Sequence, residues 1–219
     1  MPVEVALTFD DGPHPDGTRR ILELLAEHAV KATFFVWGER AAQHREVVED
    51  VLACGHSVQP HCWAHDSHWS LGPDGIRADI EEVMALLGDL GAPTPHLWRP
   101  PYGHLLRVAT RAIAAQHSLE LAGWTINPKD YEGTDATRMY DDVAGQLADE
   151  DSRPVVLMHD GHRETGQHVR RADTSNTCGL VHLLLGDHAL RFALLSGGVE
   201  AGLREGPSRS DPPKHRGGP

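Results

Sequence analysis

The chain has 219 residues, a length that fits one domain or two small ones. Hydrophobic residues make up 40% and charged residues 24%, as in globular proteins, and no apolar run approaches the ~20 residues that a membrane-spanning helix needs. The 20 Lys and Arg residues against 32 Asp and Glu residues give a net charge of −12. The lack of a long apolar run argues against a membrane span. The negative field repels phosphate backbones and anionic lipids, and so argues against a nucleic-acid partner.

The cysteines and the N-terminus bear on the compartment. Cys54, Cys62 and Cys178 are odd in number and lack CxxC spacing, so we expect reduced thiols rather than a disulfide framework or a thiolate zinc site. Residues 1–7 show no basic region, long apolar stretch or small-residue cleavage site. We therefore expect a cytoplasmic protein, or a secreted one if a leader has been trimmed from this sequence.

Short apolar runs rich in β-branched residues alternate with longer segments of helical periodicity. In chain order, the patterns predict alternating strands and helices at residues 4–9 and 18–27, 32–36 and 39–54, 56–59 and 74–90, 97–99 and 105–116, 120–125 and 138–149, and 155–159 and 179–186, with a last strand at 191–195. About seven such units predict one α/β domain, either a barrel-like parallel sheet or an open doubly wound sheet. We expect the domain to span residues 1–203 and a disordered tail rich in Pro, Gly and Arg to follow at 204–219.

Polar residues follow the expected strands at their carboxyl ends, where α/β barrels carry catalytic groups. The first group is the Thr-Phe-Asp-Asp-Gly-Pro segment at residues 8–13. Neighbouring side chains at a strand end point different ways, so one of Asp10 and Asp11 can bind a metal while the other accepts a proton.

His61 and His65 follow the strand expected at 56–59 and are four residues apart. If the segment after Pro60 makes one helical turn, both imidazoles face one side and bind a divalent ion together with a carboxylate. His68 is the alternative to His65. Two His and one Asp leave coordination positions open, as in hydrolytic sites, and suit Zn²⁺, with Co²⁺ or Ni²⁺ as alternatives.

Three further segments place polar residues at strand ends. Arg99 lies in a rigid Pro-rich turn at 98–103, where a guanidinium can hold a carboxylate and a backbone N–H can face an oxyanion. Asp130 lies in the segment 124–131, and His159 follows the apolar run at 155–158. Each segment alone is equally typical of a loop or of a core histidine, so their combination is what indicates an active site.

Taken in order, these five segments resemble the motifs of the polysaccharide deacetylase family, also called the NodB-homology domain or carbohydrate esterase family 4. TFDDGP stands at 8–13, H-[ST]-x-x-H at 61–65, R-x-P-[FY] at 99–102 and L-x-H at 157–159. The resemblance runs from about residue 5 to residue 195. It implies a deformed (β/α) barrel and metal-dependent removal of an acetyl group from an N-acetylated amino sugar, an oligosaccharide or a related small amide.

The resemblance also implies roles for single residues. Asp11, His61 and His65 would bind the metal, Asp10 would be the base that Arg99 orients, and His159 would be the acid, with Asp130 as the candidate that raises its basicity. The backbone N–H of Tyr102 would stabilise the oxyanion, and Leu157 and Trp124 would line a pocket for the acetyl methyl group.

The sequence departs from the family's motifs at three positions. Cys62 replaces a Ser or Thr whose hydroxyl supports the histidine loop, Pro60 replaces an Asn, and Asn127 replaces the first carboxylate of the fourth motif. The polar segment 161–171 after His159 is expected to shape substrate choice.

The expected cytoplasmic location favours a small N-acetyl compound over a cell-wall polymer as the substrate. Two alternative functions stay open at this point: a ring-opening hydrolase of cyclic amides or imides on the same barrel, and an inactive carbohydrate-binding relative. The oligomeric state is not indicated by the sequence.

Overall fold

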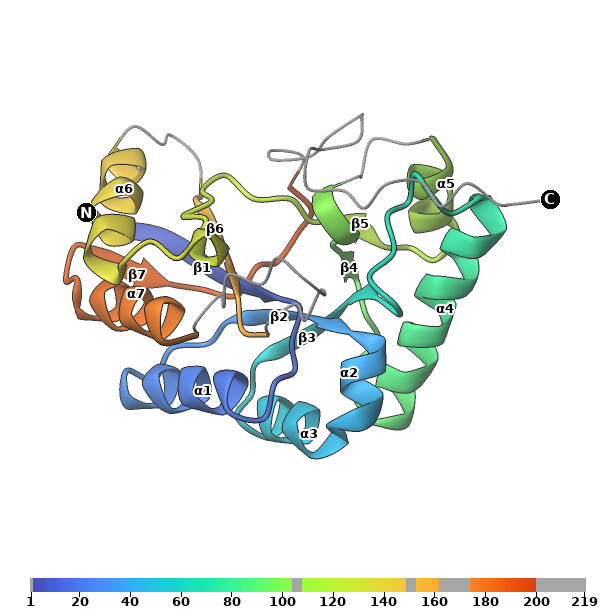
Figure 1. The fold of residues 1–219 in the computed structure, drawn as a ribbon, viewed down its shortest axis with the longest axis horizontal. Helices are drawn as coiled ribbons and strands as arrows, with labels where there is room; N and C mark the ends of the chain where they lie inside the picture. Colours follow the sequence, from blue (N-terminus) through green and yellow to red (C-terminus); the bar gives the residue numbers. More distant parts are fainter. Residues whose placement is uncertain (1, 104–107, 149–152, 162–173, 200–219) are drawn as a thin grey trace.

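The computed structural model describes residues 2–103, 108–148, 153–161 and 174–199 (Figure 1). The tail expected at 204–219 and nearly all of the polar segment expected to shape substrate choice lie outside these residues. Among the helices that the structure describes, none combines the length and the apolar character that crossing a membrane requires.

The strands form a parallel sheet that curls into a deformed barrel. They are β1 (Val3–Asp10), β2 (Thr33–Trp37), β3 (Ser57–Cys62), β4 (Leu97–Trp98), β5 (Glu120–Leu121), β6 (Val155–His159) and β7 (Leu190–Phe192). The main sheet has the order β3-β2-β1-β6, β7 also pairs with β1, and β4 pairs with β5. All of these pairings are parallel, and single parallel bridges join Ile126 to Val156 and Ala122 to Val199. The barrel expected from the βα alternation is therefore present in one domain.

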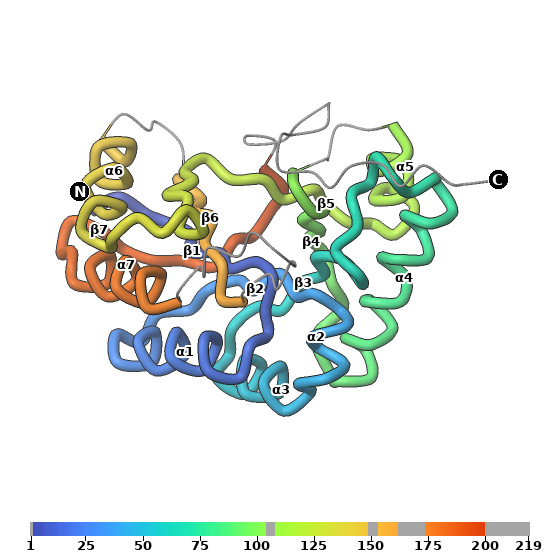
Figure 2. Tube along the Cα trace, viewed as in Figure 1, coloured from blue at the N-terminus to red at the C-terminus, as the bar shows by residue number. Residues whose placement is uncertain are grey.

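Helices surround the strands on the outside, as Figures 1 and 2 show. They are α1 (Gly17–Glu27), α2 (Gly38–Gln43), α3 (Arg45–Ala53), α4 (Pro73–Asp89), α5 (Val108–Gln116), α6 (Ala136–Ala148) and α7 (Thr174–Gly186), with short 3₁₀ turns η1 (Pro101–Gly103) and η2 (Asp130–Glu132). The prediction of one helix at 39–54 is wrong. His44 leaves the helical region at φ −127° and ψ 50° and separates α2 from α3.

Alternate residues of β1 face the two sides of the barrel wall. Val5, Leu7 and Phe9 belong to the large apolar cluster between the sheet and the helices. Ala6 instead packs in a smaller cluster with residues from several other strands, which is the barrel interior. Because side chains alternate along a strand, Asp10 falls on the same face as Ala6 and is directed towards that interior.

The barrel is irregular between β3 and β4. The side chain of Gln59 bridges the gap, because its Oε1 accepts the backbone N–H groups of His96 and Leu97 at 3.1 and 3.0 Å. One residue further along, the carbonyl of Pro60 accepts the N–H of Arg99 at 3.4 Å. These bonds fix the end of β3, which carries His61, beside the turn that carries Arg99.

Candidate active site

The residues that the sequence analysis singled out meet at the carboxyl ends of the strands. Asp10 ends β1 and is the register partner of His159, which ends β6. His61 lies near the end of β3, and Arg99 directly follows β4. This is the end at which α/β barrels assemble catalytic groups from several strands.

Asp11, His61 and His65 form a compact, buried group. Asp11 Oδ1 lies 3.3 Å from Nε2 of His61 and 3.0 Å from Nε2 of His65. One donor atom from each of the three residues lies within 4.8 Å of the others, so the group has the size of a metal site. Two imidazoles and a carboxylate are also the donor set of catalytic zinc sites.

The position of the proton on the His61 ring shows whether the group can accept a cation. Nδ1 of His61 lies 2.5 Å from the carbonyl oxygen of Arg99, and a carbonyl can only accept, so Nδ1 carries the proton. In the neutral ring, Nε2 then presents a lone pair to Asp11, and the two acceptors repel unless a positive charge lies between them. Outer hydrogen bonds of this kind orient metal-binding histidines in proteins. The residues present therefore fit a divalent ion.

The electrostatics of the group also favour a cation. Burial by itself raises the pKa of Asp11, but the charge of His65 and the close contacts of both imidazoles with its carboxylate hold that pKa well below its usual value. Burial lowers the pKa of His61, yet the charges of Asp10 and Asp11 raise it above the ordinary value. The same field that attracts a proton to this point attracts a metal ion.

The histidine pair does not depend on a helical turn, so that expectation is wrong. β3 continues through Cys62, and the chain then bends, with His65 in the left-handed region at φ 56°. Asp11 and Tyr102 also have positive φ values of 70° and 60°. Non-glycine residues in this region are uncommon and cluster at functional sites, where the surrounding structure must hold them.

Arg99 is fully buried inside the barrel, and its guanidinium holds Asp10. Nη1 donates to Asp10 Oδ1 and to Thr8 Oγ1 at 2.8 Å each. Nε and Nη2 donate to the carbonyls of Ala122 and Gly123 at 2.9 and 2.7 Å. The position expected for Arg99 beside Asp10 is thus observed, and Asp10 Oδ1 is fixed at the site's inner edge.

His159 and Asp130 form a second pair. Asp130 Oδ1 accepts Nδ1–H of His159 at 2.8 Å, and Oδ2 accepts both the backbone N–H of His159 at 2.8 Å and the hydroxyl of Thr177 at 2.9 Å. Burial lowers the pKa of His159, but the charge and hydrogen bond of Asp130 outweigh it and raise the pKa to about 10. In the fourth motif, the carboxylate that contacts His159 is therefore that of Asp130, and the amide at Asn127 does not remove this contact.

Three residues expected to contact substrate lie around this centre. The ring of Tyr102 packs edge-on against His65 with the centroids 4.9 Å apart. Leu157 shares the strand face of His159, and Trp124 is half-buried against the interior cluster, with the guanidinium of Arg99 5.9 Å from its ring. These positions are near the centre, while the roles of the three residues stay predictions.

The departures at Cys62 and Asn127 have local structural explanations. Burial and the charge of Asp79 raise the pKa of the Cys62 thiol well above its usual value, while a hydrogen bond from the backbone N–H of His65 lowers it. The thiol thus receives a bond from the loop, as a hydroxyl would. His68 is buried elsewhere, with Nδ1 3.1 Å from Thr110 Oγ1, and is not part of the metal group.

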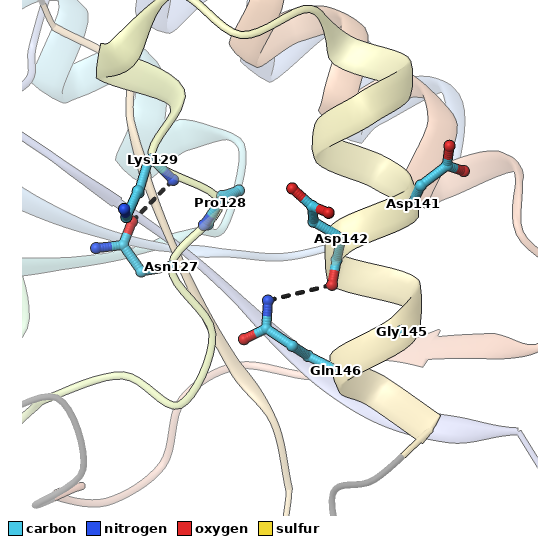
Figure 3. Close-up of a pocket in the computed structure, with 7 residues that line it drawn as sticks. All are labelled: Asn127, Pro128, Lys129, Asp141, Asp142, Gly145 and Gln146. Atoms are coloured by element: carbon cyan, nitrogen blue, oxygen red, sulfur yellow. Dashed lines mark hydrogen bonds between the residues drawn. The ribbon is translucent and has the colours of Figure 1, made fainter.

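Asn127 shapes its own turn instead of supporting the acid. Its Oδ1 accepts the backbone N–H of Lys129 at 2.9 Å, as Figure 3 shows. Both residues line a cavity of about 490 Å³ between this segment and α6, in which Gln146 bonds the carbonyl of Asp142. The lining of that cavity includes none of the metal group.

Sequence reasoning missed three residues that support the site. Thr177 on α7 bonds Asp130, Thr8 bonds Arg99, and Asp79 on α4 bonds the histidine loop. Thr8 was visible inside the TFDDGP segment. Thr177 lies 47 residues from Asp130, and Asp79 lies 16 residues from Trp63 on the next helix, so no local pattern marks either residue.

A family model of polysaccharide deacetylases matches residues 2–122. A peptidoglycan-N-acetylglucosamine deacetylase from Bacillus cereus is 34% identical over 158 residues, which are 71% of this chain and 55% of the relative. A chitooligosaccharide deacetylase from Rhizobium leguminosarum bv. phaseoli is 37% identical over 165 residues, 71% of this chain and 67% of the relative. The chain thus spans about half the length of the Bacillus cereus relative.

Solved structures agree with the sequence comparison. A family 4 carbohydrate esterase from Streptomyces lividans, in complex with acetate, superposes with a TM-score of 0.73 and 26% identity. The superposition covers 89% of this chain and 93% of the esterase. The match therefore extends over both halves of the barrel.

Proposed function

Because the chain belongs to the polysaccharide deacetylase family, we propose that it is a metal-dependent N-deacetylase that acts on an N-acetylated amino sugar. The observation that carries the proposal is the buried group of Asp11, His61 and His65 beside two proton-transfer groups with separate supports. A barrel that only binds a ligand would not require Arg99 to orient the Asp10 carboxylate or Asp130 to support the His159 imidazole.

Asp11, His61 and His65 would hold the divalent ion, for which Zn²⁺ is our choice and Co²⁺ or Ni²⁺ would satisfy the same ligands. When bound, the ion supplies a Lewis acid that polarises the acetyl carbonyl and lowers the pKa of the attacking water. Nδ1 of His61 is held by the Arg99 carbonyl, which keeps Nε2 available for this role.

Asp10 is the proposed general base. Its bond to Arg99 engages Oδ1 and orients the carboxylate, so Oδ2 can take a proton from the water as the new C–O bond forms. The backbone N–H of Tyr102 would face the developing oxyanion. Leu157 and Trp124 would surround the acetyl methyl group.

His159 is the proposed general acid. With Nδ1 held by Asp130, the proton on Nε2 is the one that can be given to the leaving nitrogen as the C–N bond breaks. The raised pKa, about 10, keeps the imidazole protonated at neutral pH before that step. The products are acetate and a free amine.

The proposed substrate class is an N-acetylglucosamine-containing glycan or oligosaccharide. The support comes from the two relatives, whose names specify peptidoglycan N-acetylglucosamine and chitooligosaccharides. A small N-acetyl compound, the substrate expected from the sequence, stays in the test as a separate arm.

The test is acetate release by the metal-reconstituted protein against a chelator-treated control. The panel holds N-acetylglucosamine, chitooligosaccharides, peptidoglycan fragments, acetylated xylooligosaccharides, small N-acetyl amines and a cyclic imide. Asp10→Asn serves as a matched control, because its side chain keeps the shape of the base. Metal-dependent acetate from an N-acetyl substrate, lost in the control variant, supports the proposal.

Other outcomes identify the alternatives. Release from acetylated xylan alone would make the protein an esterase, and ring opening of the imide without acetate release would replace the deacetylase proposal. If protein that binds one equivalent of metal formed no product from any substrate of the panel, the result would favour the alternative that the protein is an inactive carbohydrate-binding relative.

A further inference from the structure

We infer that the carboxylate of Asp79 on α4 positions the metal-binding turn and thereby sets the affinity of the site for its ion. The inference rests on the metal site of the proposed function. Asp79 is a positioning residue, because it contacts the backbone between the two histidines and is not a member of the metal group.

The turn between the histidines needs external support. His61 is still in β3, whereas His65 is in the left-handed region at φ 56°, a conformation that a residue with a Cβ rarely adopts. Three residues must therefore redirect the chain so that both Nε2 atoms reach Asp11 Oδ1. Such a conformation persists only where the surroundings hold it.

Asp79 supplies that support by binding two successive N–H groups of the turn. Oδ2 accepts the N–H of Trp63 at 2.9 Å, and Oδ1 accepts the N–H of Ala64 at 3.3 Å. Hydrogen bonds from backbone N–H groups to an ionised carboxylate are stronger than neutral ones. Both oxygens are engaged, so the carboxylate fixes the direction of two peptide units at once.

The packing of α4 holds Asp79 in a fixed position. Its neighbours Ile76 and Ile80 on α4 are fully buried in an apolar cluster, which prevents the helix from turning or sliding. A second helix also contacts the turn, because the carbonyl of Trp63 accepts the N–H of Glu39 at the start of α2 at 3.1 Å. The turn is thus held by two helices, and Asp79 is the side chain that grips its N–H groups.

Metal affinity is the quantity this arrangement controls. If the turn relaxes, the two imidazoles no longer meet at Asp11, and the ligands must be ordered again at the moment of binding. Loss of outer groups that orient metal ligands typically weakens binding about 10- to 100-fold. We expect a loss in this range for Asp79→Ala.

The experiment compares Zn²⁺ dissociation constants of the full-length apo-proteins, measured by competition with a chromogenic chelator at a temperature well below unfolding. Asp79→Asn keeps one acceptor oxygen and should lose less affinity than Asp79→Ala. Glu82→Gln removes a carboxylate charge from an exposed position on the same helix and should bind Zn²⁺ as the parent does. The visible spectrum of the Co²⁺ form should change in Asp79→Ala and stay unchanged in Glu82→Gln.

A purely structural role would lower the melting temperature of apo Asp79→Ala while leaving its Zn²⁺ affinity within about twofold of the parent, and that result would overturn the inference. Should Asp79→Ala fail to fold, Asp79→Asn is decided by the same criterion. No measurement here uses substrate, so a parent protein that binds Zn²⁺ through Asp79 but releases no acetate would refute only the proposed function. A parent that binds no divalent ion would refute both.

Discussion

Replacing Asp130 by Asn should move the alkaline limit of activity down by several pH units. His159 has a pKa of about 10 because Asp130 outweighs the effect of burial. Without that charge, burial opposes the smaller contributions of Asp11 and Asp10, so the pKa should fall towards the ordinary value of about 6.5. An imidazole with the ordinary pKa is only about 10% protonated at pH 7.5, so kcat should fall up to ~10-fold. At pH 8.5 the loss should reach ~100-fold.

The assay is acetate release by the Asp130→Asn and parent proteins between pH 5.5 and 10. Stability gives a second readout whose sign is fixed by the same shift. Because the folded-state pKa of His159 is raised, its contribution is complete below about pH 6.5 and is lost as the pH rises towards 10. Asp130→Asn should therefore lower the melting temperature more at pH 6 than at pH 10. An activity loss of equal size at every pH would show that Asp130 does not act through the protonation of His159.

Three other substitutions test single parts of the site. Asp11→Ala should lose both metal and turnover, and full metal content by elemental analysis would remove Asp11 from the ligands. Asp10→Asn should keep its metal and lose ~10²- to 10⁴-fold in kcat, the usual contribution of a general base; near-normal turnover would contradict that role. Thr177→Val should lower the free energy of unfolding by about 1 kcal/mol, because Asp130 loses a buried hydrogen-bond donor, and Thr177→Ser should lose less. If denaturant titrations gave the two variants equal losses of unfolding free energy, the Thr177 hydroxyl would not be the group that stabilises the fold.

The parts of the fold that follow local patterns could be predicted from the sequence. The apolar strand at 155–159 agrees with β6, and the periodicity at 74–90 gives α4 to within a residue. The break at His44 could not be foreseen, because residues 39–54 keep a helical pattern on both sides of it.

In the candidate site, too, some features follow from local sequence patterns and others do not. Asp10 and His159 end apolar strands, so their meeting follows from parallel pairing, which a sequence pattern can indicate. The path from His61 to His65 could not be predicted, since the i,i+4 spacing suggests a helical turn and the observed turn is held by Asp79 from another element. Contacts between distant segments leave no local signal.

The buried guanidinium of Arg99 makes the stability of the fold depend on Asp10, which is also the proposed general base. In many enzymes, replacing a catalytic group stabilises the fold, because active sites trade stability for function. Here Asp10 neutralises a cation that is fully enclosed, and removing one partner of a buried ion pair typically costs about 3–5 kcal/mol. Selection for heat resistance alone should therefore retain Asp10, even in a lineage that no longer needs the reaction.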